Sequence, residues 1–293
     1  MNLLEKKQMT YWQRIKVAFQ YAMPQIYLTR CAGWLAKQSW GPVTHFVIKL
    51  FAKKYGINME EAEKPNFTDY STFNQFFIRQ LKENARPIDS TPDTLVLPAD
   101  GRISQCGHIT ADQLLQAKGH PYSLAALLAG DEELIADFQN GEFVTTYLSP
   151  RDYHRVHMPC DAELRRMIYV PGELFSVNPF LNEHIPGLLA RNERVICVFD
   201  TEFGKMVQIL VGATITASIS TVWAGVINPP RLGEVKIWHY TDGSIKLAKG
   251  AEMGAFRLGS TVINLFQSNR VQLADTLQTD SVTRVGEVLG YKK

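Results

Sequence analysis

The hydrophobic pattern of this chain changes near residue 84, and that change constrains the possible folds most. In the first part, apolar residues recur at helical intervals, and two of these helical runs are expected to end at Pro24 and at Gly56. In the second part, short alternating runs are punctuated by Gly, Pro and Asp-Gly, which is typical of strands and tight turns. We therefore expect an α+β fold in which a helical region over 1–83 precedes a β-rich domain, sandwich-like or barrel-like, over 84–293.

Composition excludes several classes of protein. The 293 residues are 45% hydrophobic and 20% charged, which is enough to bury a core and excludes wholesale disorder. The four cysteines lie far apart without a CxxC pair, so we expect reduced, mostly buried thiols rather than a zinc ribbon or a disulfide scaffold. The N-terminus reaches charged residues before any apolar core, which is not the pattern of a secretory signal.

One uncharged stretch, from Met206 to Pro230, is long enough to span a bilayer. Its Thr and Ser content, its β-branched residues and its final Pro-Pro favour strands instead. We expect a soluble or peripheral protein.

The first 56 residues are strongly basic. They hold nine Lys and Arg against one acid, a net charge of +8, together with three of the five Trp. Basic helices with aromatic residues on their apolar face suit an anionic membrane surface, where each Lys or Arg adds about 1 kcal/mol. The alternative is a helical subdomain packed on the core with solvated lysines. Nucleic acid is disfavoured as a partner, because the aromatic residues follow helical spacing rather than forming a strand platform.

Three further local elements are expected. Residues 120–141 should form one helical stretch ended by Asn-Gly, and the sequence Thr-Asp-Gly-Ser at 241–244 is a hairpin signal. A short helix capped by Asp69 or Ser71 should carry four apolar residues. These are Phe73, Phe76, Phe77 and Leu81.

Two short motifs place acid and imidazole groups at turns. Asp100 lies in Pro-Ala-Asp-Gly after an apolar run, where plain turn chemistry is the simpler interpretation. His154 and His157 lie between two prolines, and no third residue at a suitable spacing supports a zinc site. If this segment is extended, the two imidazoles face opposite sides and have different roles. Imidazole titrates near neutrality, so a proton-transfer role for at least one is expected.

A third motif offers a nucleophile. Ser260 follows Gly259, and a Ser hydroxyl can attack the carbonyl of its own preceding peptide when a base takes its proton. The motif is not a GxSxG nucleophile elbow, because Val262 stands where the last Gly belongs. Asp, His and Ser together can form a charge relay whatever their order in the chain. The residues by themselves indicate a serine nucleophile and leave its reaction open.

Taken together, these motifs resemble one known family. The segments KGAEMGAF and LGST, SPRD and YHRVHMP, PADG, and VGATI with TVWAG and PPR occur in the order found in bacterial phosphatidylserine decarboxylases of prokaryotic type I. The similarity covers nearly the whole chain, including the basic N-terminal region and the segment from Asn74 to Lys82.

This resemblance implies a proenzyme that cuts itself between Gly259 and Ser260. Matching the family motifs assigns Asp100, His157 and Ser260 to the charge relay for this reaction. The large chain 1–259 and the small chain 260–293 are expected to remain associated as a heterodimer, and two heterodimers are expected to pair.

The resemblance also implies the chemistry of turnover. Ser260 becomes a pyruvoyl group, which forms a Schiff base with the serine headgroup of phosphatidylserine and accepts the electrons released with CO₂. The product is phosphatidylethanolamine, and neither pyridoxal phosphate nor a metal ion is required. His154 or His157 is the expected proton donor, and the resemblance does not decide between them. The enzyme is expected at the cytoplasmic face of the inner membrane as a peripheral protein, without a nucleic-acid partner.

Three other functions are compatible with part of this sequence. A membrane-surface serine hydrolase would use Asp100, His157 and Ser260 on a lipid ester in an intact chain. A non-catalytic membrane-binding module would explain the basic residues but none of the motifs. Pyruvoyl enzymes that act on small soluble substrates would have no use for the basic, aromatic N-terminal region.

Overall fold

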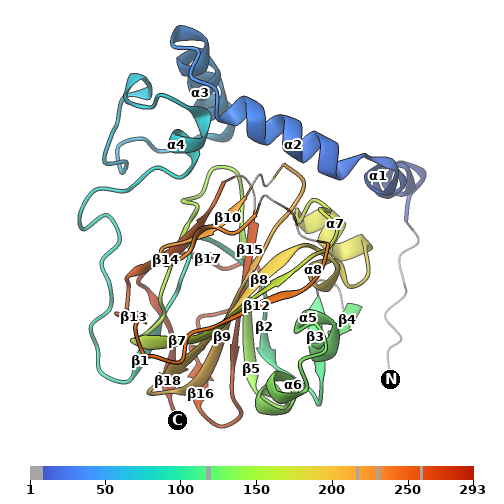
Figure 1. Ribbon diagram of the computed structural model, residues 1–293, viewed down its shortest axis with the longest axis vertical. Coiled ribbons are helices and arrows are strands. Elements are labelled where there is room, and N and C mark those ends of the chain that lie inside the picture. The colour runs from blue at the N-terminus through green and yellow to red at the C-terminus, as the bar shows by residue number, and fades with distance from the viewer. Residues whose placement is uncertain (1–8, 117–119, 216–217, 229–230, 232, 258–259) are drawn as a thin grey trace.

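The computed structural model describes residues 9–116, 120–215, 218–228, 231, 233–257 and 260–293. A helical region lies at one end of a β-rich domain, with α1, α2 and α3 above the strands in the view of Figure 1. The N-terminal helices are α1 (Tyr11–Ala22), α2 (Gln25–Ala36), α3 (Pro42–Tyr55), the 3₁₀ helix η1 (Phe67–Asp69) and α4 (Phe73–Phe77). Helices followed by sheets confirm the predicted α+β class.

Local sequence signals set the ends of the first helices. The Thr10 hydroxyl accepts from the Gln13 backbone N–H, and the Gln13 side chain accepts from the Thr10 N–H, which is a capping box at the start of α1. Pro24 separates α1 from α2. Gly56 adopts the left-handed conformation (φ 65°) that ends α3. The predicted helix ends at Pro24 and at Gly56 are therefore confirmed.

The short helix α4 differs from its prediction in two ways. Thr72, rather than Asp69 or Ser71, caps it, because Thr72 is extended and its side chain accepts from the Gln75 N–H. The helix ends at Phe77, and Leu81 lies beyond it in an antiparallel bridge with Ala62.

The β-rich domain contains four further helices and all the strands. Its helices are α5 (Leu124–Leu127), α6 (Glu132–Phe138), α7 (Pro179–His184) and α8 (Leu188–Arg191). Its strands are β1 (Thr94–Val96), β2 (Gly101–His108), β3 (Gln113–Gln116), β4 (His120–Ser123), β5 (Glu142–Leu148), β6 (Arg155–His157), β7 (Ala162–Val170), β8 (Arg194–Thr201), β9 (Gly204–Val211), β10 (Ile219–Thr221), β11 (Gly225–Val226), β12 (Lys236–His239), β13 (Lys246–Leu247), β14 (Glu252–Phe256), β15 (Ser260–Phe266), β16 (Val271–Leu273), β17 (Val282–Thr283) and β18 (Val288–Lys292).

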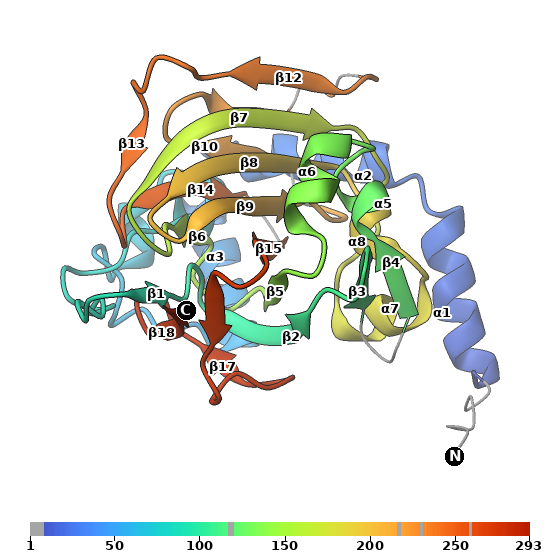
Figure 2. The same cartoon turned by 90° about the horizontal axis from the view of Figure 1, so that it is seen from below.

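One large antiparallel sheet organises the domain. Its strand order is β12-β7-β8-β9-β15-β5-β2-β17, with β13 also paired to β7, and Figure 2 shows these strands following one another across the molecule. Smaller sheets have the orders β11-β10-β14-β6, β1-β18-β16 and β3-β4. The first two share a core with one face of the large sheet, whereas α5 to α8 pack on its other face (Figure 2). Strand β15 lies inside the large sheet and is buried along its whole length.

Three sequence predictions for this domain can be checked. The uncharged stretch that begins at Met206 contains β9, β10 and β11, so strands rather than a membrane helix are confirmed. Residues 120–141 form a strand and two short helices, because Ser123 and Asp131 each cap a new helix within the stretch. Gly243 makes a turn, but the flanking strands β12 and β13 both pair with β7 and not with each other, so the hairpin prediction was wrong.

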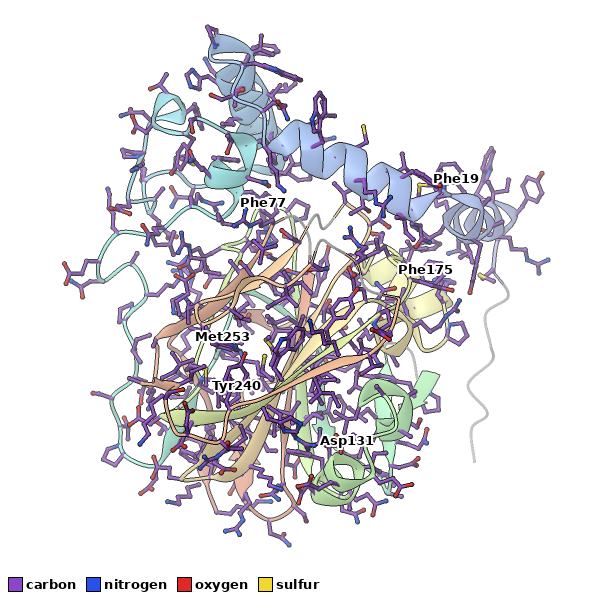
Figure 3. All side chains as sticks on the ribbon, in the orientation of Figure 1. Phe19, Phe77, Asp131, Phe175, Tyr240 and Met253 are labelled. Atoms are coloured by element: carbon purple, nitrogen blue, oxygen red, sulfur yellow. The ribbon has the colours of Figure 1, made fainter. Side chains whose placement is uncertain are left out.

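Polar contacts fasten the first two helices to the β-rich domain. The Gln20 amide donates to the Thr214 hydroxyl (3.2 Å), and the Gln25 side chain accepts from the backbone N–H of Leu174 (2.8 Å). Most apolar side chains of α1 are exposed, as Phe19 is, although Val17 packs against the domain core. Phe77 lies between the helical region and the domain (Figure 3). Within the described ranges, no helix is both long enough and apolar enough to cross a membrane.

Candidate active site

The first strand residue after the predicted cleavage point is in contact with an imidazole. Ser260 begins β15 opposite Leu148 of β5 and is completely buried. Its Oγ lies 3.5 Å from Nδ1 of His154, and Nε2 of the same ring lies 3.0 Å from the backbone oxygen of Ser149. A carbonyl can only accept, so Nε2 carries the proton and Nδ1 presents its lone pair to the Ser260 hydroxyl. Gly259 lies outside the described residues.

The surroundings of His154 keep its imidazole neutral. The Phe77 ring packs against it at 4.1 Å between centroids, and the side chain is fully buried. Burial and, to a lesser extent, the nearby Arg79 guanidinium lower the pKa of His154 to about 3, although the hydrogen bond to Ser149 opposes both effects. At neutral pH this residue therefore has no charge, and any proton that it receives is readily passed on.

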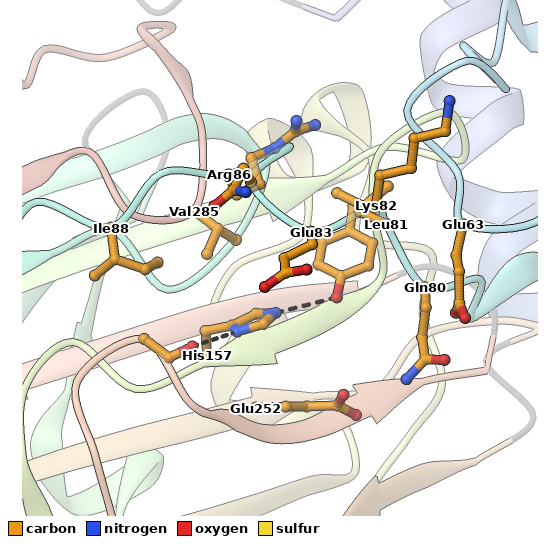
Figure 4. Close-up of a pocket in the computed structure, with 13 residues that line it drawn as sticks. Glu63, Gln80, Leu81, Lys82, Glu83, Arg86, Ile88, His157, Glu252 and Val285 are labelled. Carbon is orange, nitrogen blue, oxygen red and sulfur yellow. Dashed lines mark hydrogen bonds between the residues drawn. The ribbon is translucent and has the colours of Figure 1, made fainter.

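His157 has a different environment from His154. Its Nδ1 lies 2.8 Å from the backbone oxygen of Gly250, so Nδ1 carries the proton, and its Nε2 lies 3.1 Å from the Tyr153 hydroxyl. Burial lowers the pKa of His157, and the Gly250 hydrogen bond and the charge of Glu252 oppose that effect. His157 and Tyr153 line a cavity of about 570 Å³, and Figure 4 shows both hydrogen bonds of the ring. The two imidazoles therefore contact different groups, and their different roles stay a prediction.

Asp100 is held by an arginine. It sits in the turn before β2, and its oxygens accept from Nε of Arg86 (3.0 and 2.9 Å) and from Nη2 (2.6 Å). The backbone N–H of Val285 donates to the same carboxylate (2.9 Å). The following Gly101 is required here, because a Cβ at this position would lie 2.2 Å from the backbone oxygen of Tyr147.

The structure therefore brings Ser260 together with His154, while Asp100 and His157 each have other partners. Asp100 lines a cavity of about 260 Å³, and His157 lines the larger one. Arg86 and Tyr153 line both cavities and stand between them. In this uncut chain the three relay residues that the family motifs assign do not form a continuous hydrogen-bonded chain across the described residues.

Several residues of the site were not singled out from the sequence. Phe77 and Arg79 lie in the segment that carried the family resemblance, but nothing in the segment indicated that they would reach His154. Arg86 lies outside the motifs, and Tyr153 begins the motif YHRVHMP but was given no role there. The described ranges contain no candidate metal site, because no group of three or more His, Cys, Asp or Glu residues is placed to hold an ion there.

Comparison with known proteins identifies the family. The family model described as "Phosphatidylserine decarboxylase" matches residues 73–291, and a second, described as "PSD", matches residues 15–56. Proteins named "Phosphatidylserine decarboxylase proenzyme" are similar over almost their whole length. That of Mannheimia succiniciproducens is 74% identical over 100% of both chains. That of Pasteurella multocida is 72% identical over 100% of both. That of Haemophilus influenzae is 72% identical over 97% of this chain and 98% of its own. The chain that carries this buried Ser260–His154 contact belongs to the phosphatidylserine decarboxylase family.

Proposed function

We propose that this carboxy-lyase, which converts phosphatidylserine to phosphatidylethanolamine, acts through a pyruvoyl group that it makes from its own Ser260. The observation that carries the proposal is the position of Ser260. It is the first residue of a buried central strand, and its Oγ points to the unprotonated nitrogen of a neutral imidazole. A serine placed there suits self-cleavage at its own N-terminal peptide bond better than attack on a bulky lipid ester from solution.

Self-cleavage needs only the chain and water. A base takes the Ser260 proton, Oγ bonds to the carbonyl carbon of Gly259, and the bond from that carbon to the Ser260 nitrogen breaks. The resulting ester loses the Gly259 carboxylate by elimination across Cα and Cβ of Ser260. Hydrolysis then releases ammonia and leaves a keto group at the new N-terminus. The products are chains 1–259 and 260–293.

The relay for this step is proposed from Asp100, His157 and Ser260. Asp100 and His157 lie in adjoining cavities, and the charge of Asp100 acts on the His157 ring. To complete a relay, His157 must exchange its bonds to Gly250 and Tyr153 for bonds to Asp100 and Ser260. We therefore assign the geometry described here to a resting form of the uncut chain.

His154 is proposed as the proton-transfer residue of turnover. A keto group at residue 260, when present, withdraws electrons from the α-carbon of the substrate, so that CO₂ can leave. The residues around Ser260 fit such a group: Ser260 is fully buried, and the neutral imidazole beside it packs against the Phe77 ring. Nδ1 of His154 lies 3.5 Å from Oγ of Ser260, whereas both nitrogens of His157 are engaged elsewhere, and these contacts support the choice of His154.

Sheet pairing explains how the two chains would stay together after cleavage. Strand β15 starts at the cut and pairs with β9 on one side and β5 on the other. Further along the small chain, β17 pairs with β2 and β18 pairs with β1. Each partner strand belongs to the large chain, so separating the chains would break the central sheet. We propose a stable heterodimer, and the pairing of two heterodimers stays a prediction.

The helical region is proposed to dock on an anionic membrane surface. The exposed fractions of Trp12, Tyr27, Trp34 and Phe46 are 71%, 73%, 59% and 66%. Lysine and arginine residues on the same three helices supply positive charge. This arrangement favours a peripheral enzyme on the cytoplasmic face of the inner membrane, with the substrate drawn from the same leaflet.

Intact-mass spectrometry of the purified protein, combined with a decarboxylation assay on phosphatidylserine vesicles, tests the proposal. We expect two chains divided at residues 259 and 260, with the small chain blocked to stepwise N-terminal sequencing. Ser260→Ala should remain one chain without activity, and Ser244→Ala, in a surface turn, should be cut normally. A single unmodified 33.1 kDa species with full activity would overturn the proposal.

A further inference from the structure

One guanidinium joins the helical region to the proposed relay. Nη2 of Arg86 donates to the Asp100 carboxylate and also to Oε2 of Glu61 (2.6 and 2.7 Å), while Nη1 donates to the backbone oxygen of Ala85 (2.7 Å). The Arg86 and Asp100 side chains are only 11% and 10% exposed, and that of Glu61 is 29% exposed. Glu61 precedes the predicted boundary at residue 83, whereas Asp100 belongs to the β-rich domain.

Arg86 is the cation that holds both carboxylates of this cluster. Its removal leaves Glu61 and Asp100 without the guanidinium that donates to both. A second guanidinium in the same cavity, that of Arg79, acts on Asp100 by its charge but donates to the backbone oxygens of Arg151 and Asp152 instead. A partly buried carboxylate that loses its hydrogen-bond donor moves toward water, and Asp100 then loses the orientation that a relay acid needs.

Arg86 also lies at the wall shared by the two cavities that Asp100 and His157 line. It lines both the small cavity with Asp100 and the larger cavity with His157, and Figure 4 shows it at the wall of the latter. Nε of Arg86 contacts both oxygens of Asp100, which fixes the plane of the carboxylate as well as its position. Lysine keeps the charge but cannot fix the plane in this way.

We propose that Arg86 is a positioning residue for self-cleavage, which holds the Asp100 carboxylate in a fixed orientation and is itself held by Glu61 from the helical region. This inference rests on the proposed function, because it assumes that Asp100 takes part in cutting the chain. Arg86 acts through Asp100, and its side-chain hydrogen bonds go to Asp100, Glu61 and Ala85 rather than to Ser260. Glu61 makes the helical region part of the same arrangement.

Cell-free synthesis followed over time on denaturing gels tests the proposal, because it shows the uncut chain and chain 1–259 directly. Arg86→Gln should slow cutting by about a hundredfold, as expected when a reacting group is misplaced by about an ångström. Arg86→Lys should recover part of this loss, and Glu61→Gln should cost less than Arg86→Gln. Arg165→Gln removes a comparable ion pair on β7, remote from the site, and should be cut at the normal rate.

A double variant separates positioning from a purely structural role. If Arg86 acts through Asp100, Arg86→Gln should slow Asp100→Asn no further, although each change still alters the melting temperature. Normal cutting of Arg86→Gln overturns the inference, and so does a loss in the double variant equal to the two single losses combined. If the unaltered chain and Ser260→Ala are both uncut in the same gels, the proposed function fails instead.

Discussion

The helical region and the β-rich domain place their apolar side chains in opposite ways. In the domain, Phe256 and Phe266 are at most 1% exposed and pack between sheets. On α1 to α3, Trp12, Phe19 and Phe46 are more than 60% exposed, although their spacing is equally regular. Burying apolar surface contributes about 25 cal/mol per Å², so the domain gains this energy on folding. The exposed apolar side chains of the helices would gain the same kind of energy only by binding another surface, such as a membrane.

The two regions also differ in how they carry charge. The cations of α1 to α3 lie at the surface, where salt screens them, whereas Arg86 and Asp100 of the β-rich domain are only 11% and 10% exposed. The domain therefore holds the groups that need fixed positions, and the helices hold groups that act over an area. This division of roles predicts that chemistry and membrane binding can be separated by substitution.

The largest effect should come from the relay. Asp100→Asn and His157→Ala should each slow cutting by about three orders of magnitude, if they act as a unit with Ser260 as other triads do. The fraction of uncut chain on denaturing gels measures this effect. Normal cutting of Asp100→Asn would remove Asp100 from the relay and weaken the assignment of chemistry to the β-rich domain.

The other histidine should separate cutting from turnover. His154→Ala should be cut at least in part, because His157 remains, and its decarboxylation per cut chain should fall by about 10²–10⁴-fold, the contribution typical of a proton donor. Carbon dioxide release from phosphatidylserine vesicles, normalised to the amount of small chain, gives the result. If His154→Ala is never cut, its contact with Ser260 identifies it as the base for self-cleavage.

Removing the first two helices should reduce membrane binding and leave self-cleavage in place. Deleting residues 1–38 takes away α1 and α2 and keeps α3, whose Ile48 and Ala52 pack with Phe76 next to the site. A deletion of 1–56 would expose that core, so the shorter cut is the cleaner test. Flotation with anionic vesicles should fall steeply while self-cleavage continues. Unchanged vesicle binding would mean that these helices only cover the domain.

Acid should weaken the folded domain through its buried imidazoles. His154 has a pKa of about 3 in the folded chain and near 6.5 when unfolded, because burial disfavours its charge. The unfolded chain therefore binds more protons, and the free energy of unfolding should fall as the pH drops from about 6.5 toward 3, by up to about 1.4 kcal/mol per pH unit. The lowered pKa of His157 acts in the same direction.

Urea titrations of Ser260→Ala measure how the free energy of unfolding changes with pH, because that variant is expected to remain a single chain. Adding His154→Gln should make the slope shallower between pH 6.5 and pH 4.5. Equal slopes in the two proteins would show that His154 is accessible to protons in the folded state, contrary to its full burial.

The smallest effect should be that of salt on membrane binding. Attraction between the lysines and anionic lipid is screened over about 10 Å at 0.1 M salt, whereas the burial of aromatic rings is not. High salt should therefore weaken binding several-fold, and Trp12→Ala should weaken the part that remains. Equal binding to neutral and anionic vesicles would show that charge has no role in docking.

Local sequence signals predicted much of this molecule. Pro24 and Gly56 set helix ends, and the Thr-rich, β-branched stretch after Met206 formed strands, because each depends on residues only a few positions apart. The signals failed where neighbours in space decided the outcome. The turn at Gly243 does not join a hairpin, because both flanking strands find a better partner in β7.

The sequence by itself determined the family, the two regions and the set of motif residues. Only the tertiary structure decided which histidine faces Ser260, because the two are 106 residues apart and meet through the pairing of β15 with β5. The same holds for Arg86, which reaches Asp100 and Glu61 from a segment without a motif. Sequence patterns describe contacts within a strand or a helix turn. The order of strands in a sheet, which places distant residues side by side, depends on packing over the whole chain.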